Sequence, residues 1–273
     1  VEVPSERCQL SSWLRPAGVL GAGGYVAGPV GLAAALRRVP LVLMEADSHL
    51  GLTNRLLAPF ARRVCLAFPL DGRDGPRYRV TGRPVPSGGT DREAARARFG
   101  IDPGETCVLV FGGSQGARSI NRAAVAAFTG AGFRVLHAAG ERDLASLSAP
   151  GPGYDLRGYI PDFSEAIVAS DLVVARSGGS VFEVAAQGRP MILIPYPHAT
   201  ADHQTANARY FERAGAAVVI PDGELSTARL ASEVGRLLAD PGALAAMGRA
   251  AAGLARPDAA REIAAELLAA ADR

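Results

Sequence analysis

The sequence contains no lysine, only three cysteines and no long apolar run. All of its basic charge outside histidine is carried by 29 arginines, which nearly balance 27 acidic residues. Alanine, glycine and proline are also abundant, so a GC-rich coding sequence explains the missing lysine better than a functional requirement does. The near-neutral balance argues against a protein whose main partner is nucleic acid.

The scarcity of cysteine excludes two classes of small site. Cys8, Cys65 and Cys107 are far apart and odd in number, which fits neither a disulfide framework nor a zinc site. His198 and His203 have no third ligand nearby, so we expect no metal and no other cofactor. No apolar run reaches the ~18 residues of a membrane span. The first residues lack a signal-peptide pattern, so we expect a cytoplasmic protein.

Short apolar runs alternate with helical stretches along the chain, which predicts an α/β protein with parallel sheets. Strands are expected at 17–20, 41–44, 64–68, 78–81, 107–111, 134–137, 154–159, 173–175, 192–194 and 217–220. The alternation pauses in a Pro- and Gly-rich stretch at 86–90, after which Thr90 and Glu93 form a capping box that opens a helix. We therefore expect an N-terminal domain over 1–86, a second over 87–256, a cleft between them, and a C-terminal helix over 257–273 that packs back on the first domain.

A glycine-rich run, Gly-Gly-Ser-Gln-Gly-Ala at 112–117, lies between a predicted strand and a predicted helix. Small residues let a ligand approach the backbone, and the free N–H groups of a helix start favour a phosphate. Ser114 and Gln115 could add side-chain donors. A tight turn that packs the helix on its sheet would use the same glycines, so both interpretations stay open.

Two further patterns also have two interpretations. Ser180 and Glu183 have the spacing of a capping box, but Glu183 could instead accept hydrogen bonds from two ribose hydroxyls. Asp202 and Gln204 could bind neighbouring sugar hydroxyls, or Asp202 could cap a helix. The glycines at 21–28 do not form a dinucleotide fingerprint, because Val26 occupies the third glycine position. A nicotinamide-dependent oxidoreductase is therefore disfavoured.

Taken together, these segments resemble the MurG family of peptidoglycan glycosyltransferases. The resemblance is carried by residues 21–29, 51–54, 112–117, 176–178, 188–190 and 202–204, with Glu183 and Asn207. It implies a GT-B fold, in which two Rossmann-like domains face a cleft. It also implies inverting, metal-independent transfer of N-acetylglucosamine from UDP-N-acetylglucosamine to lipid I, which forms lipid II at the cytoplasmic face of the membrane.

The resemblance also assigns roles by motif. It implies that Ser114 and Gln115 contact the diphosphate, and that Gly179, Ser180 and Val181 line the helix start beside it. The backbone of Tyr159 and Ile160 would read uracil, Glu183 would bind the ribose, and Gln204 the sugar hydroxyls. Further donor-side candidates are Asp47, Arg83, Asp202, His203 and Asn207.

The chain departs from the family pattern at several places. The family's Gly-x-Gly-Gly-His loop is missing, so we expect the catalytic base to lie before Val1 and this chain alone to have little activity. Asp47 stands where the family tends to have asparagine, and residues 83–86 replace its Asn-Pro-Val-Arg. Two alternatives therefore stay open: a donor-binding module that needs a separate chain for the acceptor half, and a GT-B epimerase acting on UDP-N-acetylglucosamine.

A lipid-linked acceptor implies peripheral attachment to the inner face of the plasma membrane. The residues expected to contribute are apolar or basic and lie in the first domain: Arg37, Arg38, Leu56, Leu57, Phe60, Arg62 and Arg63. For the leucines, an ordinary amphipathic helix packed on its own sheet is the competing interpretation.

Overall fold

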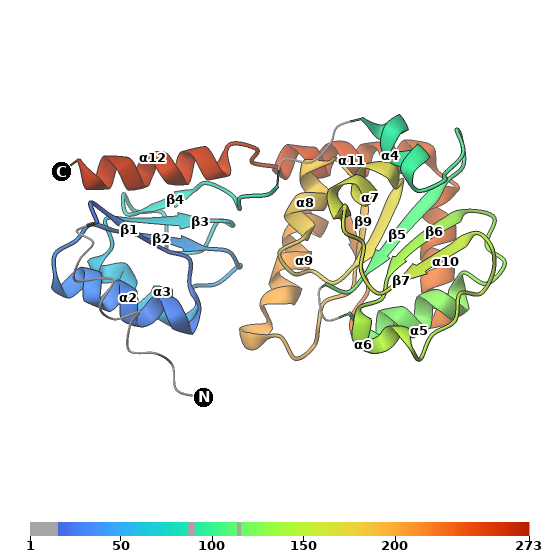
Figure 1. The fold of residues 1–273 in the computed structure, drawn as a ribbon, viewed down its shortest axis with the longest axis horizontal. Coiled ribbons are helices and arrows are strands. Elements are labelled where there is room, and N and C mark those ends of the chain that lie inside the picture. The colour runs from blue at the N-terminus through green and yellow to red at the C-terminus, as the bar shows by residue number, and fades with distance from the viewer. Residues whose placement is uncertain (1–15, 87–90, 114–115, 273) are drawn as a thin grey trace. The chain divides into compact units, whose positions relative to one another are not determined.

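The computed structural model describes residues 16–86, 91–113 and 116–272 (Figure 1). The chain folds into two compact units, one comprising residues up to Pro84 together with those from Asp258, the other Val85–Pro257. Both units are built from parallel strands and helices, which confirms the predicted α/β class. Within the described residues, no helix is both long and apolar enough to cross a membrane.

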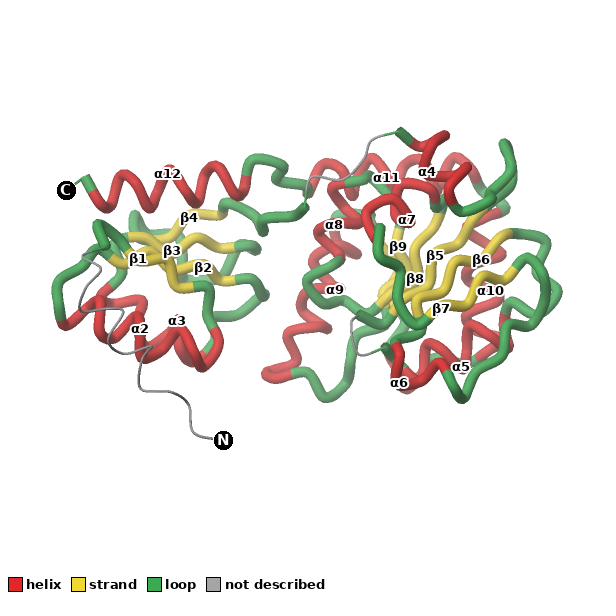
Figure 2. Tube along the Cα trace, in the orientation of Figure 1, coloured by secondary structure: helices red, strands yellow, loops and turns green. Residues whose placement is uncertain are grey.

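The first unit contains a four-stranded parallel sheet in the order β1-β2-β3-β4. The strands are β1 (Val19–Gly21), β2 (Leu41–Glu45), β3 (Arg63–Leu66) and β4 (Tyr78–Val80). The helices are α2 (Gly24–Leu36), α3 (Leu52–Leu57), the short 3-10 turn η1 (Ala58–Phe60) and α12 (Ala259–Ala271). Figure 2 shows α2 and α3 on one face of this sheet and α12 on the other.

Alternation along β2 explains why both faces of the first sheet are covered. Leu41 and Leu43 pack with Leu57 of α3 in one cluster, whereas Val42 packs with Ile263 of α12 in another. Successive side chains of a strand point to opposite faces, so a strand buried on both sides reads as a continuous apolar run. Helix α12 thus completes the core of the first unit.

The second unit contains a six-stranded parallel sheet in the order β10-β9-β8-β5-β6-β7. In chain order the strands are β5 (Cys107–Phe111), β6 (Arg134–Ala138), β7 (Tyr154–Arg157), β8 (Leu172–Ala175), β9 (Met191–Leu193) and β10 (Ala217–Val219). Numbered within the unit, this is the order 3-2-1-4-5-6 of a doubly wound sheet. The chain winds outward from β5 to β7, then returns beside β5 and winds the other way.

Helices cover both faces of the second sheet (Figure 1). They are α4 (Arg92–Arg98), α5 (Arg118–Ala127), α6 (Glu141–Leu144), α7 (Phe163–Ala169), α8 (Val181–Ala186), α9 (His203–Arg213), α10 (Thr227–Leu238) and α11 (Pro241–Leu254), with 3-10 turns η2 (Thr200–Asp202) and η3 (Asp222–Glu224). Ile120 of α5 and Leu230 of α10 pack on β5 residues such as Val108. Most strand residues here are fully buried, as expected for a sheet covered on both sides.

Two of three helix starts lack the side-chain cap that their sequence pattern allows. Helix α4 is capped by Asp91, whose carboxylate accepts from the Ala94 N–H at 3.0 Å, and Thr90 lies outside the described residues. Ser180 precedes α8 but its hydroxyl makes no capping hydrogen bond. Asp202 precedes α9 in a left-handed conformation, also without a side-chain cap. Capping sequences mark helix starts, but the cap forms only where the entering backbone aims the side chain at the helix N–H groups.

Candidate functional site

The centre of the second sheet brings two of the predicted motifs to one edge. β5 and β8 pair in parallel, with Phe111 opposite Ala175 at their carboxyl ends. The loop after β5 contains the glycine-rich run, and the loop after β8 contains residues 176–180. The strand order reverses between these two strands, and ligands of open α/β sheets bind at such a point.

The glycines of the β5–α5 loop are required by its backbone. A Cβ on Gly112 would lie 2.4 Å from the Ala117 nitrogen, and one on Gly116 would lie 2.1 Å from the Ala139 carbonyl oxygen. Gly113 and Gly116 also have φ values of 90° and 73°, which favour glycine. Ser114 and Gln115, two predicted phosphate contacts, lie outside the described residues.

The β8–α8 loop is held by a buried arginine. The Arg176 guanidinium, 9% exposed, donates to the carbonyl oxygens of Ile194 and Pro195 at 3.1 and 3.0 Å and to Asp222 Oδ1 at 2.6 Å. It also donates to Ser119 Oγ of α5 at 2.8 Å. One side chain therefore ties β8 to the loops after β9 and β10 and to the first turn of α5.

Helix α9 braces the same loop from the other side. Asn207 is buried and donates to the Ser177 carbonyl at 3.0 Å, while the Ser177 hydroxyl donates to the Gln204 carbonyl at 2.7 Å. The Gln204 side-chain oxygen accepts from the Tyr196 N–H at 3.0 Å. Gln204 Nε2 lies close to Gly178, 3.8 Å from where a Cβ would be. Asn207 thus supports the loop, and Gln204 lies beside the turn that the sequence assigns to the donor.

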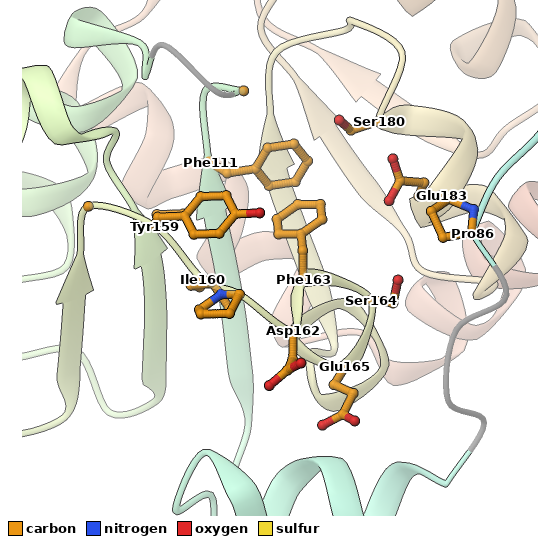
Figure 3. Close-up of a pocket in the computed structure, with 14 residues that line it drawn as sticks. Pro86, Phe111, Tyr159, Ile160, Asp162, Phe163, Ser164, Glu165, Ser180 and Glu183 are labelled. Atoms are coloured by element: carbon orange, nitrogen blue, oxygen red, sulfur yellow. The ribbon is translucent and has the colours of Figure 1, made fainter.

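A cavity of about 550 Å³ opens beside these loops (Figure 3). Its lining residues come from the linker, from the ends of β5 and β6, from the segment after β7 and from the start of α8: Pro86, Phe111, Gly113, Ala138, Gly158–Glu165, Ser180 and Glu183. Phe111 and Phe163 meet edge to face, with ring centroids 4.8 Å apart. Tyr159 is 63% exposed beside them, so the cavity has an aromatic floor.

Ser180 and Glu183 both line this cavity, as Figure 3 shows. Because the Ser180 hydroxyl makes no cap, the capping-box interpretation loses one of its two hydrogen bonds. Ile160 lines the same cavity and is 2% exposed. The start of α8 and the segment after β7 are therefore gathered around one volume that suits a small molecule with polar and flat parts.

The remaining predicted residues of the second unit that the structure describes are not among those that line this cavity. Gly179 is half-buried in the β8–α8 loop, and Val181 is fully buried as the first residue of α8. His203 Nδ1 lies 2.8 Å from the Thr200 carbonyl oxygen, and Asp202 is exposed.

Two predicted donor-side residues belong to the first unit. The Asp47 N–H donates to Glu45 Oε1 at 3.2 Å. Arg83 follows β4 and is half-buried. The positions of both residues are therefore set by the strands that precede them, β2 for Asp47 and β4 for Arg83.

Sequence reasoning missed the groups that hold the site together. Arg176 was noticed only as part of a motif, and its partners Ser119 and Asp222 carried no local signal. The aromatic pair Phe111 and Phe163 was also missed, since each lies in an ordinary apolar run. A buried arginine directly after a buried strand was the one usable signal, because such a charge must be paired.

Comparisons with known proteins agree with this architecture. Residues 107–263 match the glycosyltransferase family 28 C-terminal domain, and residues 9–66 match the N-terminal domain of that family. A protein from Moorella thermoacetica is 44% identical over 269 residues, covering 91% of this chain and 72% of its own length. Its name is UDP-N-acetylglucosamine--N-acetylmuramyl-(pentapeptide) pyrophosphoryl-undecaprenol N-acetylglucosamine transferase. A protein of the same name from Rubrobacter xylanophilus is 41% identical, covering 97% of this chain and 80% of its own.

Solved structures give the same result. The crystal structure of Acinetobacter baumannii MurG has a TM-score of 0.75 and 28% identity, covering 96% of this chain and 76% of that one. A UDP-GlcNAc 2-epimerase from Neisseria meningitidis has a TM-score of 0.65 at 14% identity, covering 97% and 79%, and shows likeness of fold alone. With the family match spanning more than half of the sequence, the chain belongs to glycosyltransferase family 28.

Proposed function

We propose that this protein is a GT-B N-acetylglucosaminyltransferase that moves N-acetylglucosamine from UDP-N-acetylglucosamine to lipid I, forming lipid II. The observation that carries the proposal is the pairing of β5 with β8, which puts two glycine-containing strand–helix loops and a cavity of about 550 Å³ at one sheet edge. Relatives above 40% identity bear the name of this transferase.

The donor fits the cavity by chemical type. Glu183 supplies a carboxylate for the ribose hydroxyls, and the aromatic floor with Ile160 suits a flat base. The diphosphate would lie between Gly113 and the Ser180 turn, beside Gly179 and Val181. Ser114 and Gln115 would complete that side. Gln204, whose Nε2 lies beside Gly178, would bind the sugar hydroxyls.

The further donor-side candidates differ in their hydrogen bonds and exposure. Asp202 is exposed and could reach the sugar, whereas His203 and Asn207 already bond backbone carbonyls. We therefore assign these two a supporting role. Asp47 and Arg83 stay proposals for the donor from the first unit.

The chemistry proposed is an inverting displacement. The acceptor hydroxyl attacks the anomeric carbon of N-acetylglucosamine and releases its proton to a general base or to water. The bond from that carbon to the diphosphate oxygen breaks, and UDP leaves with the bonding electron pair. Negative charge builds on the departing diphosphate. Backbone N–H groups and the positive end of α5, a helix of 10 residues, stabilise it.

A binding experiment tests this proposal directly. We expect calorimetry to detect binding of UDP and UDP-N-acetylglucosamine, with UDP bound more tightly than NAD. Transfer is measured separately, with radiolabelled UDP-N-acetylglucosamine and a short-chain lipid I analogue. Failure to bind UDP, or tighter binding of NAD, contradicts the proposal.

We also propose that the first unit attaches the protein peripherally to the inner face of the membrane. Leu56 and Phe60 are 62% and 61% exposed, next to a hollow lined by Arg62, Arg63 and Arg77. Exposed apolar side chains beside arginines suit an anionic bilayer surface, where each basic residue contributes about 1 kcal/mol.

Two residues predicted for this surface take different roles. Leu57 is 5% exposed and packs in the core below β2 and β3, so its assignment to the surface was wrong. Consecutive residues of a helix point about 100° apart, so Leu57 can face the sheet while its neighbour Leu56 is exposed. Arg63 pairs with Glu266 at 2.7 Å, which neutralises its charge.

Vesicle sedimentation tests the attachment. Replacing Arg62 and Arg77 with alanine should weaken binding to vesicles rich in phosphatidylglycerol, and added salt should weaken it further. The matched control replaces Arg249 and Arg256, exposed arginines of the second unit. Equal losses in both variants refute the assignment of this surface.

A further inference from the structure

A chain of three buried polar side chains lies beneath the β5–α5 loop. Asn121 of α5 and His137 of β6 are 0% exposed, and Tyr154 of β7 is 6% exposed. The Tyr154 hydroxyl lies 2.7 Å from His137 Nδ1, and His137 Nε2 lies 3.0 Å from Asn121 Oδ1. None of these groups lines the cavity described above.

The hydrogen bonds of this network run in one direction. The Asn121 amide nitrogen donates to the Ala139 carbonyl at 2.8 Å and to Asp143 Oδ2 at 3.1 Å, so Oδ1 must be the atom that accepts from His137. His137 then carries its proton on Nε2, and Nδ1 accepts from the Tyr154 hydroxyl. Burial lowers the pKa of His137 to about 4, which keeps the ring neutral as this arrangement requires.

The network ends on the Ala139–Gly140 peptide, against which the β5–α5 loop packs. The Ala139 carbonyl oxygen lies so close to Gly116 that a Cβ there would be 2.1 Å away. The next residue, Gly140, donates its N–H to the Gly158 carbonyl at 2.9 Å. Gly158 belongs to the cavity wall. The Ala139–Gly140 peptide thus touches both the glycine loop and the wall that continues to Ile160.

Polar side chains are a costly way to fill this space. Neighbouring core positions of α5, such as Ile120 and Ala124, are apolar and pack well. A buried amide or hydroxyl loses its hydration and regains it only through well-aligned partners. Apolar packing would hold α5 on the sheet equally well, but it could not fix the direction of a single carbonyl.

We propose that Asn121 is a positioning residue for the donor diphosphate. Asn121 orients the Ala139 carbonyl, and His137 holds the Asn121 amide in place. Gly116 packs against this carbonyl, and the carbonyl thereby shapes the phosphate side of the site. The proposal rests on the proposed function above. It assigns Asn121 an effect on the affinity for the diphosphate and none on the affinity for the nucleoside.

Comparing UDP with uridine tests this assignment. Asn121→Ala should lower UDP affinity roughly tenfold, the scale of one lost hydrogen bond, while uridine affinity changes less than about twofold. Tyr154→Phe is the matched control, because it removes a hydroxyl from the far end of the same network. That variant should melt at a lower temperature yet keep the wild-type ratio of UDP to uridine affinity. Equal losses for both ligands overturn the proposal.

Amide hydrogen exchange supplies a readout that needs no ligand. The Gly116 N–H donates to the Gly113 carbonyl at 2.9 Å, so its exchange rate reports the shape of the loop. Asn121→Ala should speed exchange at Gly116 more than in α10, and unchanged exchange there overturns the proposal. If the wild-type protein binds no UDP, the proposed function fails while this measurement still decides the positioning role. Asn121→Ser serves the same purpose should the alanine variant not fold.

Discussion

Replacing Glu183 with alanine gives the sharpest test of the donor site. The side chain is half-buried and lines the cavity, and the neighbouring Ser180 hydroxyl forms no cap. A hydrogen bond to a charged group contributes about 1.5–3 kcal/mol, and partial exposure lowers that. We therefore expect UDP to bind about 1–3 kcal/mol more weakly, or about 5- to 150-fold in Kd.

Calorimetry with UDP and 2′-deoxy-UDP shows whether the lost contact is to the ribose. If Glu183 accepts from the 2′-hydroxyl, the penalty of Glu183→Ala shrinks for the deoxy ligand, giving a coupling energy above about 0.5 kcal/mol in the double-mutant cycle. Glu165→Ala is the control, since Glu165 also lines the cavity but pairs with Arg98 at 2.9 Å. If Glu183→Ala leaves UDP affinity unchanged but lowers the melting temperature, Glu183 stabilises the start of α8 and does not bind the donor.

Three further predictions concern stability. Gly116→Ala should lower the free energy of unfolding, measured in urea, by more than Gly130→Ala does. Both glycines have positive φ, but only a Cβ on Gly116 would meet another atom, the Ala139 carbonyl oxygen at 2.1 Å. Gly130→Ala should cost about 1–2 kcal/mol, and equal costs for the two variants would refute the overlap. Ala201→Gly should raise the melting temperature, because Ala201 has φ 52° and left-handed backbone costs about 1–2 kcal/mol outside glycine; an unchanged or lower value contradicts this. Burial holds the pKa of His137 at about 4, below its ordinary 6.5, so the unfolded chain takes up the proton first as pH falls. That contribution to stability is present above pH 6.5 and lost toward pH 4, and wild type should lose about 2 kcal/mol more than His137→Gln between pH 7 and pH 5. Parallel pH profiles would refute it.

Sequence motifs identified part of the candidate site. The spacing of Ser180 and Glu183 identified residues that line the cavity, and Ile160 was identified through the family resemblance. The caps were predicted less well, since the side chain that caps α4 belongs to Asp91. A capping pattern states which side chains could bond a helix start, whereas the backbone that enters the helix selects one of them. The roles of these residues toward the donor stay predictions.

Amino-acid order alone determined the alternation of buried strands with helices and the turns that need glycine, because burial and backbone freedom are properties of short segments. Only the tertiary structure decided that β8 returns beside β5, that Arg176 pairs with Asp222, and that α12 closes the core of the first unit. These contacts join residues far apart in the chain. Their partners are selected by packing and by the pairing of buried polar groups, which no local pattern encodes.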